Sequence, residues 1–334
     1  MLSWQRQIGA QTLISLTYAG NQAHRLLVLK AANPGDPALC LGLSQSNEVA
    51  AGSSTCGPFG ESTTYTSAAG ETIDGTRGPL GPAFGSVSNQ AGIGNSTYNS
   101  LKASVRYSSN LVQALAGYTY SKSIDQASNF GEQVNPGNPR LSRGLSAFDM
   151  RHNFVVSYTV HLPAAQFIHS SERWSGGWEL SGITRFSTGF PVTLMNYSDT
   201  SLWGTQSNGV NNLPADEPDY QAGSLKLNRN PRNGKTYFNT NLFSLPSSGD
   251  PGNARRRFFS GPGIDNYDMS LQKSLSLPKS RSLLVRAEAF NVFNHAQFCG
   301  PQSVNGDITD SSEFGAVVSA DAPRLLQLAA KLVF

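Results

Sequence analysis

The chain has 334 residues, of which 38% are hydrophobic and 14% charged, with a net charge of +3. Soluble domains carry about 25% charged residues; here Ser, Asn, Thr, Gln and Gly replace the missing charges, so mean hydropathy stays negative at −0.29. No run approaches the ~18–20 apolar residues of a membrane-spanning helix, which excludes a helical membrane protein, and the small net charge gives no indication of nucleic-acid binding.

Residues 3–8 predict a short strand, and residues 11–19 predict a second strand after a tight turn at Gly9-Ala10. In the second segment Thr12, Ile14, Leu16 and Tyr18 alternate with mostly polar positions, the period-two pattern of a strand with one apolar face. From residue 20 to 96 the pattern is lost in a stretch rich in Gly, Ser, Pro and Thr, which predicts a long loop.

Two of the three cysteines, Cys40 and Cys56, lie in this loop, and Cys299 stands apart. A Cys40–Cys56 disulfide is one interpretation for a protein outside the cytoplasm, and two free thiols are the other. No Cys/His spacing fits a zinc site.

Residues 98–107 and 111–121 predict the clearest hairpin. One face is apolar and rich in the small side chain of Ala, with aromatic residues near the strand ends, as at a membrane–water boundary. Its members are Leu101, Ala103, Val105, Tyr107, Val112, Ala114, Ala116, Tyr118 and Tyr120. Further strands are predicted at residues 151–162, 177–190, 265–277 and 281–293, separated by a loop at 122–150, a connection at 163–176, a very long loop at 191–263 and a turn at 278–280.

The terminal strand follows a loop at residues 294–322. Its apolar parity is Leu326, Leu328, Ala330, Leu332 and Phe334, and it ends on an aromatic residue. This pattern resembles the C-terminal signal that the barrel-assembly machinery reads on outer-membrane barrels. The residues that would carry the signal are Leu326, Leu328, Leu332 and Phe334. The alternative is an ordinary C-terminal edge strand.

Short and long connections alternate strictly along the chain, and the strands are about 9–13 residues long. Short turns on one side and long loops on the other are typical of outer-membrane barrels, whose tilted strands need ~9–11 residues. We therefore predict an all-β fold: part of an antiparallel transmembrane β-barrel of about nine strands, with short periplasmic turns and long extracellular loops. Single-chain bacterial barrels use even strand numbers, and no signal peptide is visible. We therefore expect residues 1–334 to be the C-terminal part of one longer barrel domain, without a plug or an N-terminal regulatory-like domain.

The polar parity of these strands predicts a set of charged side chains that line the lumen: Lys102, Arg106, Glu179, Arg185, Asp268, Arg286 and Glu288. They either line a pathway or contact a plug, or they only pair with one another on a polar wall. His24, His152, His161, His169 and His295 have no second ligand or acid at useful spacing, so we predict no enzyme, metal site or cofactor. Arg255-Arg256-Arg257 predicts a solvated loop.

The chain resembles the C-terminal barrel portion of TonB-dependent transporters of the Oar-like type. The matching stretches occur in order at residues 4–20, 96–101, 117–125, 148–157, 177–183, 187–191, 261–271 and 286–295. The resemblance implies an outer-membrane receptor that takes part in substrate uptake, in a complete barrel of about 22 strands. The TonB system is an expected partner only if the missing N-terminal part is present.

The expected location is the outer membrane of a Gram-negative-type bacterium, with membrane lipid and the barrel-assembly machinery as partners and no nucleic acid. The alternative function is a surface-exposed β protein that binds ligands or cells through its long loops, without transport.

Overall fold

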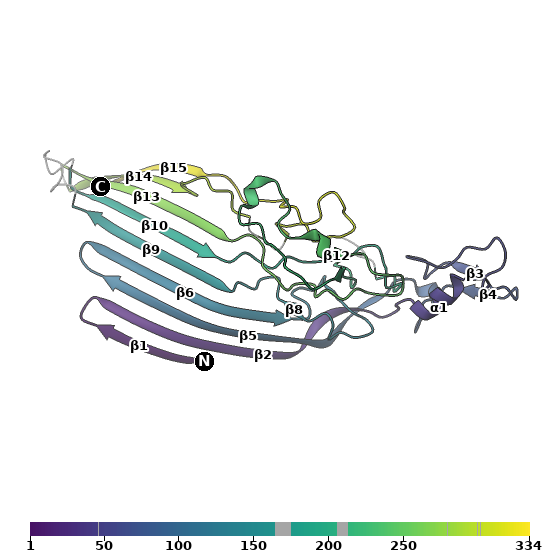
Figure 1. Ribbon diagram of the computed structural model, residues 1–334. Coiled ribbons are helices and arrows are strands. Elements are labelled where there is room, and N and C mark those ends of the chain that lie inside the picture. Colours follow the sequence, from purple (N-terminus) through teal and green to yellow (C-terminus); the bar gives the residue numbers. More distant parts are fainter. Residues whose placement is uncertain (46, 164–174, 206–212, 279, 299, 301) are drawn as a thin grey trace.

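The computed structural model describes residues 1–334 except positions 46, 164–174, 206–212, 279, 299 and 301. Its main element is one antiparallel sheet in which the long strands lie side by side in chain order, as Figure 1 shows. These strands are β1 (Leu2–Ile8), β2 (Thr12–Ala31), β5 (Ser88–Ser108), β6 (Val112–Asp125), β9 (His152–Leu162), β10 (Trp178–Ser187), β13 (Ile264–Leu277), β14 (Arg281–Phe290) and β15 (Leu325–Val333). Each predicted strand is therefore confirmed in position.

The register places every predicted apolar parity on the same side of the sheet. Val105 lies opposite Ala116, which lies opposite Val156 on the next strand. At the other edge Leu271 pairs with Ala287, and Ala287 pairs with Leu328. We call this side the apolar face and the opposite side the polar face. The alternation is continuous because each turn preserves the two-residue period between strands.

Two strands are much longer than predicted. β2 has 20 residues and β5 has 21, because residues 20–31 and 88–97, which were predicted as loop, pair with each other. Residues 88–97 are rich in Gly, Ser and Asn, and residues 20–31 contain the unbroken apolar run Leu26–Leu29, so neither segment alternates and the sequence pattern missed both. A bulge interrupts their ladder near Arg25, a non-glycine residue with a φ of 58°.

The long loops gather at one end of the sheet and the short turns at the other (Figure 1). Where the structure describes them, the loops contain only short elements. They are α1 (Pro37–Leu43), β3 (Thr64–Thr66), β4 (Thr72–Asp74), η1 (Pro82–Phe84), β7 (Gln133–Val134), β8 (Gly144–Leu145), β11 (Asp219–Tyr220), η3 (Pro231–Asn233), η4 (Thr240–Leu242) and β12 (Phe243–Ser244). The predicted connection at 163–176 and turn at 278–280 lie partly outside the described residues.

The best-buried apolar side chains lie in the loops. One cluster packs Leu194, Phe238, Phe243 and Phe259 with their neighbours. A second surrounds Cys40 and Cys56, which a disulfide joins, and includes the fully buried Tyr65. Since both clusters are made of loop residues, the loops form a packed layer over the strand ends.

The prediction that Arg255-Arg256-Arg257 is a solvated run is wrong for two of the three. Arg255 is exposed, but Arg256 and Arg257 are each only 3% exposed. The guanidinium group of Arg257 forms an ion pair with Glu132, and Arg256 Nε lies 3.3 Å from Glu217 Oε1. The Glu132 carboxylate compensates the buried positive charge, as buried ions require, whereas burial raises the pKa of Glu217 to about 8.

Within the described part of the chain, β1 and β15 each pair with a single neighbour, so the sheet is an open wall. No described helix has the length and apolar character needed to cross a membrane.

Candidate functional site

The apolar face is uncovered across the whole sheet. Leu16, Leu101, Phe186 and Leu271 are each between 40% and 44% exposed, and Leu328 reaches 82% on the edge strand. Apart from the loop end, where Leu227 and Tyr237 approach Phe186, these side chains have no second layer of described residues over them. A continuous exposed apolar surface of this extent indicates a non-aqueous neighbour.

Aromatic rings cross the apolar face near the loop end. Tyr120 and His152 have ring centroids 5.2 Å apart, Phe154 and Phe186 6.5 Å, and Phe186 and Tyr267 5.5 Å. We call this row the loop-side aromatic belt. It runs over β6, β9, β10 and β13, which lie side by side in the sheet.

A second aromatic position marks the turn end of the same face. Trp178 begins β10, and the Lys273 ammonium lies 5.3 Å from its ring centroid. Trp178 and Phe186 lie on one face of β10, and the strand between them is roughly 26 Å long at ~3.3 Å per residue. Because outer-membrane strands tilt by about 35–45°, this length spans roughly 20 Å along the membrane normal, within the ~25 Å apolar band that lies between the two aromatic girdles of such barrels.

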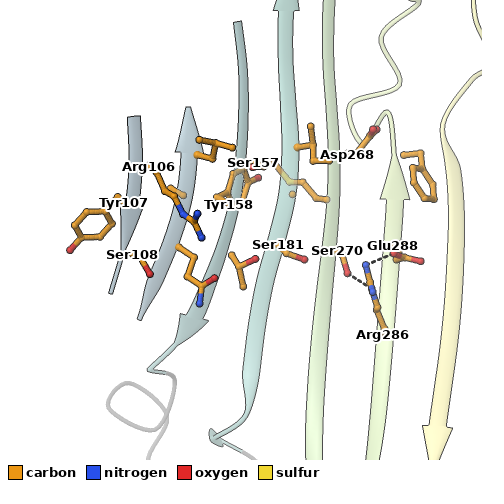
Figure 2. Close-up of a pocket in the computed structure, with 18 residues that line it drawn as sticks. Arg106, Tyr107, Ser108, Ser157, Tyr158, Ser181, Asp268, Ser270, Arg286 and Glu288 are labelled. Atoms are coloured by element: carbon orange, nitrogen blue, oxygen red, sulfur yellow. Dashed lines mark hydrogen bonds and ion pairs between the residues drawn. The ribbon is translucent and has the colours of Figure 1, made fainter. Parts of the chain in front are cut away.

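The polar face is hollowed into a cavity of about 620 Å³, shown in Figure 2. Hydroxyl, amide and charged groups line it in a row that the register carries across the sheet. Gln113 lies opposite Thr159, which lies opposite Ser181. Ser181 lies opposite Ser270, which lies opposite Glu288. Each of β6, β9, β10, β13 and β14 contributes a polar group at the paired position of the register, so the cavity presents a continuous hydrophilic track.

Four of the seven predicted lumen charges line this cavity: Arg106, Asp268, Arg286 and Glu288. Arg286 Nη2 lies 2.6 Å from Glu288 Oε1, and Arg286 Nε donates to Ser270 Oγ at 2.8 Å (Figure 2). Asp268 accepts a hydrogen bond from the Asn291 backbone N–H at 2.8 Å. Arg106, on the far side of the cavity, has no side-chain partner among the described residues. The cavity therefore has a paired side on β14 and an unpaired cation on β5.

Lys102, Glu179 and Arg185 lie on the polar face but outside the lining of the cavity. Glu179 Oε2 lies 3.3 Å from His161 Nδ1, and Arg185 Nε donates to Asn153 Oδ1 at 3.3 Å. The polar parity also contains apolar residues that the charge pattern did not reveal: Leu115, Ile183 and Phe290 line the cavity.

The other described histidines act as local partners. His152 Nδ1 is 2.7 Å from the Tyr118 hydroxyl, His24 Nδ1 is 2.7 Å from Asn95 Oδ1, and His295 Nδ1 is 3.1 Å from Asp265 Oδ2. His169 lies outside the described residues. Among the described residues, no three His, Cys, Asp or Glu side chains are grouped to hold a metal ion.

The loop layer contains strongly perturbed carboxyl groups. Burial, together with the neighbouring Asp199, raises the pKa of Glu61 to about 8 against the opposing charge of Arg77. Burial raises the pKa of Asp216 to about 7, although the Ser201 backbone N–H bonds to the carboxylate. For Glu132 burial acts in the same direction, but the charge and hydrogen bonds of Arg257 outweigh it and hold the pKa below its ordinary value.

The residues predicted as an assembly signal lie at the sheet edge. Leu326, Leu328 and Leu332 all point to the apolar face of β15, and Phe334 follows the strand with 84% of its surface exposed. The Arg281 guanidinium lies 5.7 Å from the Phe334 ring centroid. Their use as a signal stays a prediction.

Comparison with known proteins gives one family. Residues 1–327 match the sequence model of the outer membrane beta barrel domain. Among solved structures, the outer membrane transporter YddB from Escherichia coli aligns with 98% of this chain at 12% identity and a TM-score of 0.48. The chain spans 31% of the length of that transporter. No curated protein sequence matches. Because this family model matches nearly the whole chain, the chain belongs to the outer membrane β-barrel domain family and is located in the outer membrane.

Proposed function

We propose that this chain forms the C-terminal part of the barrel wall of a TonB-dependent transporter and takes part in substrate uptake across the outer membrane. The observation that carries the proposal is the continuous hydrophilic track on the lumen side, with its 620 Å³ cavity. Hydrogen-bonding groups on five neighbouring strands give a polar solute a row of partners along the wall. The ordered resemblance of residues 4–295 to Oar-like transporters supports the same assignment.

The open edges support a larger wall. β1 and β15 each lack a second neighbour in the described chain, and an outer-membrane barrel has no free edges within the bilayer. In our proposal further strands lie beyond these edges, and a plug domain packs against the polar face. The uncompensated Arg106 is the side chain best placed to contact it or an anionic solute.

Transport is tested in the native host by comparing strains that lack this gene, the TonB gene, or both. Growth is measured on a panel of limiting metals, cobamides and carbohydrates. The proposal expects at least one nutrient whose uptake falls equally in all three strains, because loss of the energising partner and of the barrel block the same step. A nutrient defect that the TonB deletion does not share would contradict it.

The second candidate, a surface receptor without transport, is favoured by the order of the loop layer. Its two apolar cores, its disulfide and the buried Glu132–Arg257 pair give the loops a fixed shape suitable for recognition. This function is favoured instead if the gene-positive strain binds a solute at its surface but takes up every nutrient no faster than the deletion strain.

A further inference from the structure

The lipid-facing side of the sheet has a second cavity at the loop end. It has a volume of about 570 Å³ and is lined mainly by apolar groups. Its floor is formed by Phe154 and Phe186 of the loop-side aromatic belt and by the neighbouring Tyr118. Its cover comes from the loop layer, through Leu227 and Tyr237. The cavity therefore opens at the height of the outer leaflet, between the barrel wall and an overhanging loop.

The overhanging loop, residues 225–237, is held rigidly. The Asn239 backbone N–H donates to the Leu225 carbonyl oxygen, and the Asn228 N–H to the Tyr237 carbonyl oxygen, both at 2.7 Å. Arg232 anchors the loop to the strand ends: Nη2 donates to the Ala296 carbonyl oxygen at 2.9 Å and lies 3.8 Å from Asp265 Oδ1. The position of the loop over the wall is thus fixed by contacts from three separate segments.

The backbone of this loop turns one leucine inward and the next outward. Leu225 packs against the aromatic core of the loop layer. Lys226 then adopts a φ of 45°, a conformation that non-glycine residues rarely adopt. Leu227 follows, 40% exposed, over the lipid-side cavity. The turn at Lys226 thus places Leu225 in the core of the loop layer and Leu227 in the lining of the lipid-side cavity.

The same loop is strongly basic. It contains Lys226, Arg229, Arg232 and Lys235, and no Asp or Glu occurs between Asp219 and Asp250. Arg232 is engaged by Asp265, but the side chains of Lys226, Arg229 and Lys235 are exposed and have no ion pair or hydrogen bond with the described residues. Three uncompensated cations therefore lie on the loop that supplies Leu227 and Tyr237 to the lining of the apolar cavity.

We propose that this cavity and its basic loop bind a phosphorylated, acylated glycolipid of the outer leaflet. Acyl chains lie against Phe154, Phe186 and Leu227, and Lys226, Arg229 and Lys235 contact the phosphate groups. The site is continuous with the lipid interface of the barrel, so a lipid reaches it by lateral diffusion. Each Lys or Arg near an anionic membrane surface strengthens binding measurably, roughly fivefold.

The test uses native mass spectrometry of the full-length protein, purified from outer membranes and exchanged into detergent. The probes are bisphosphorylated lipid A, its dephosphorylated form and phosphatidylglycerol. The variants are K226Q/R229Q/K235Q, Leu227→Asn, and the control R25Q/R140Q/R255Q. The control removes the same charge from three exposed side chains elsewhere in the extracellular part, which form no ion pair or hydrogen bond with the described residues.

Wild-type protein and the control variant should retain bisphosphorylated lipid A, whereas the triple variant K226Q/R229Q/K235Q should bind it at least about tenfold more weakly. Leu227→Asn should weaken the binding of both the bisphosphorylated and the dephosphorylated lipid A, because it removes a contact with an acyl chain. If the triple variant does not fold, Leu227→Asn tests the proposal in its place. Equal binding of lipid A by the triple variant and by wild type overturns the proposal. Equal wild-type binding of phosphatidylglycerol, or of dephosphorylated lipid A, also overturns it.

Discussion

Single buried charges in the loop layer are the residues whose loss should matter most. Arg257 and Arg255 belong to one basic run, but Arg257 is buried against Glu132 and Arg255 is exposed. Replacing Arg257 with Met leaves a buried carboxylate without its partner, which costs about 3–5 kcal/mol. Arg255→Met should be nearly neutral. Urea titration monitored by protease cleavage of the loops measures both, and equal stability of the two variants would contradict the buried pair.

The acidic groups of the same layer predict a pH dependence. Glu61 and Asp216 have folded-state pKa values of about 8 and about 7, above the ordinary values of 4.5 and 3.8. The folded layer therefore binds more protons than the unfolded chain in this interval, and its stability falls as pH rises from about 4.5 to about 8. The melting temperature of the loop layer, measured as a function of pH, gives the slope of stability against pH. Glu61→Gln and Asp216→Asn should each make this slope smaller. A slope unchanged in both variants would count against these groups.

At this scale the sequence alone predicts some roles and not others. The lumen charges follow from strand parity, a local property, and the register places all seven on the polar face. The Glu132–Arg257 pair joins positions 125 apart, and nothing in the neighbourhood of either residue indicates the other. A run of three arginines reads as solvated unless the distant carboxylates that neutralise it are known.

The strands are the elements that the sequence defines best, because a face toward lipid requires alternation. This assignment makes a sharp prediction on β13. Leu271 faces lipid, and the adjacent Gln272 faces the lumen between Glu179 and Arg286. Leu271→Arg should cost about 2–4 kcal/mol near the bilayer midplane, and Gln272→Arg should cost little. Reversible folding into lipid vesicles measures both, and a larger cost for Gln272→Arg would reverse the assignment of the faces.

Where strands leave the membrane, the sequence loses its predictive power. Residues 20–31 and 88–97 continue β2 and β5 with no alternation, since neither side needs to be apolar. The long loops likewise contain cores of their own that no periodicity reveals. Their folding depends on contacts between segments that lie far apart in the chain, such as Phe238 with Phe314.

The disulfide element of the loop layer is testable on its own. Cys40 and Cys56 close a loop with a sequence separation of 16, for which chain entropy predicts about 3 kcal/mol of stabilisation. A Cys40→Ser, Cys56→Ser double variant should therefore become protease-sensitive around α1 while the barrel keeps its heat-modifiable migration in SDS. Simultaneous loss of both properties would show that the loop layer and the wall fold as one unit.

For the whole molecule, the separation of long loops from short turns fixes the orientation in the membrane. The packed loop layer and the basic loop at residues 225–237 lie at the loop end of the sheet, and outer-membrane barrels place their long loops outside the cell. Ser224 lies exposed in the loop layer, and Ser276 lies exposed at the turn end of β13. These two serines report on opposite sides of the membrane.

In a Cys299→Ser background, Ser224→Cys should react with a membrane-impermeant maleimide on intact cells. Ser276→Cys should react only after the outer membrane is permeabilised, because the reagent cannot otherwise reach the periplasmic end. Both serines are exposed, so the difference cannot arise from burial in the protein. If only Ser276→Cys were labelled on intact cells, the inferred orientation of the barrel would be reversed. The basic loop at residues 225–237 and its lipid-side cavity would then lie at the periplasmic leaflet. Both the orientation and the glycolipid site therefore depend on the result of this experiment.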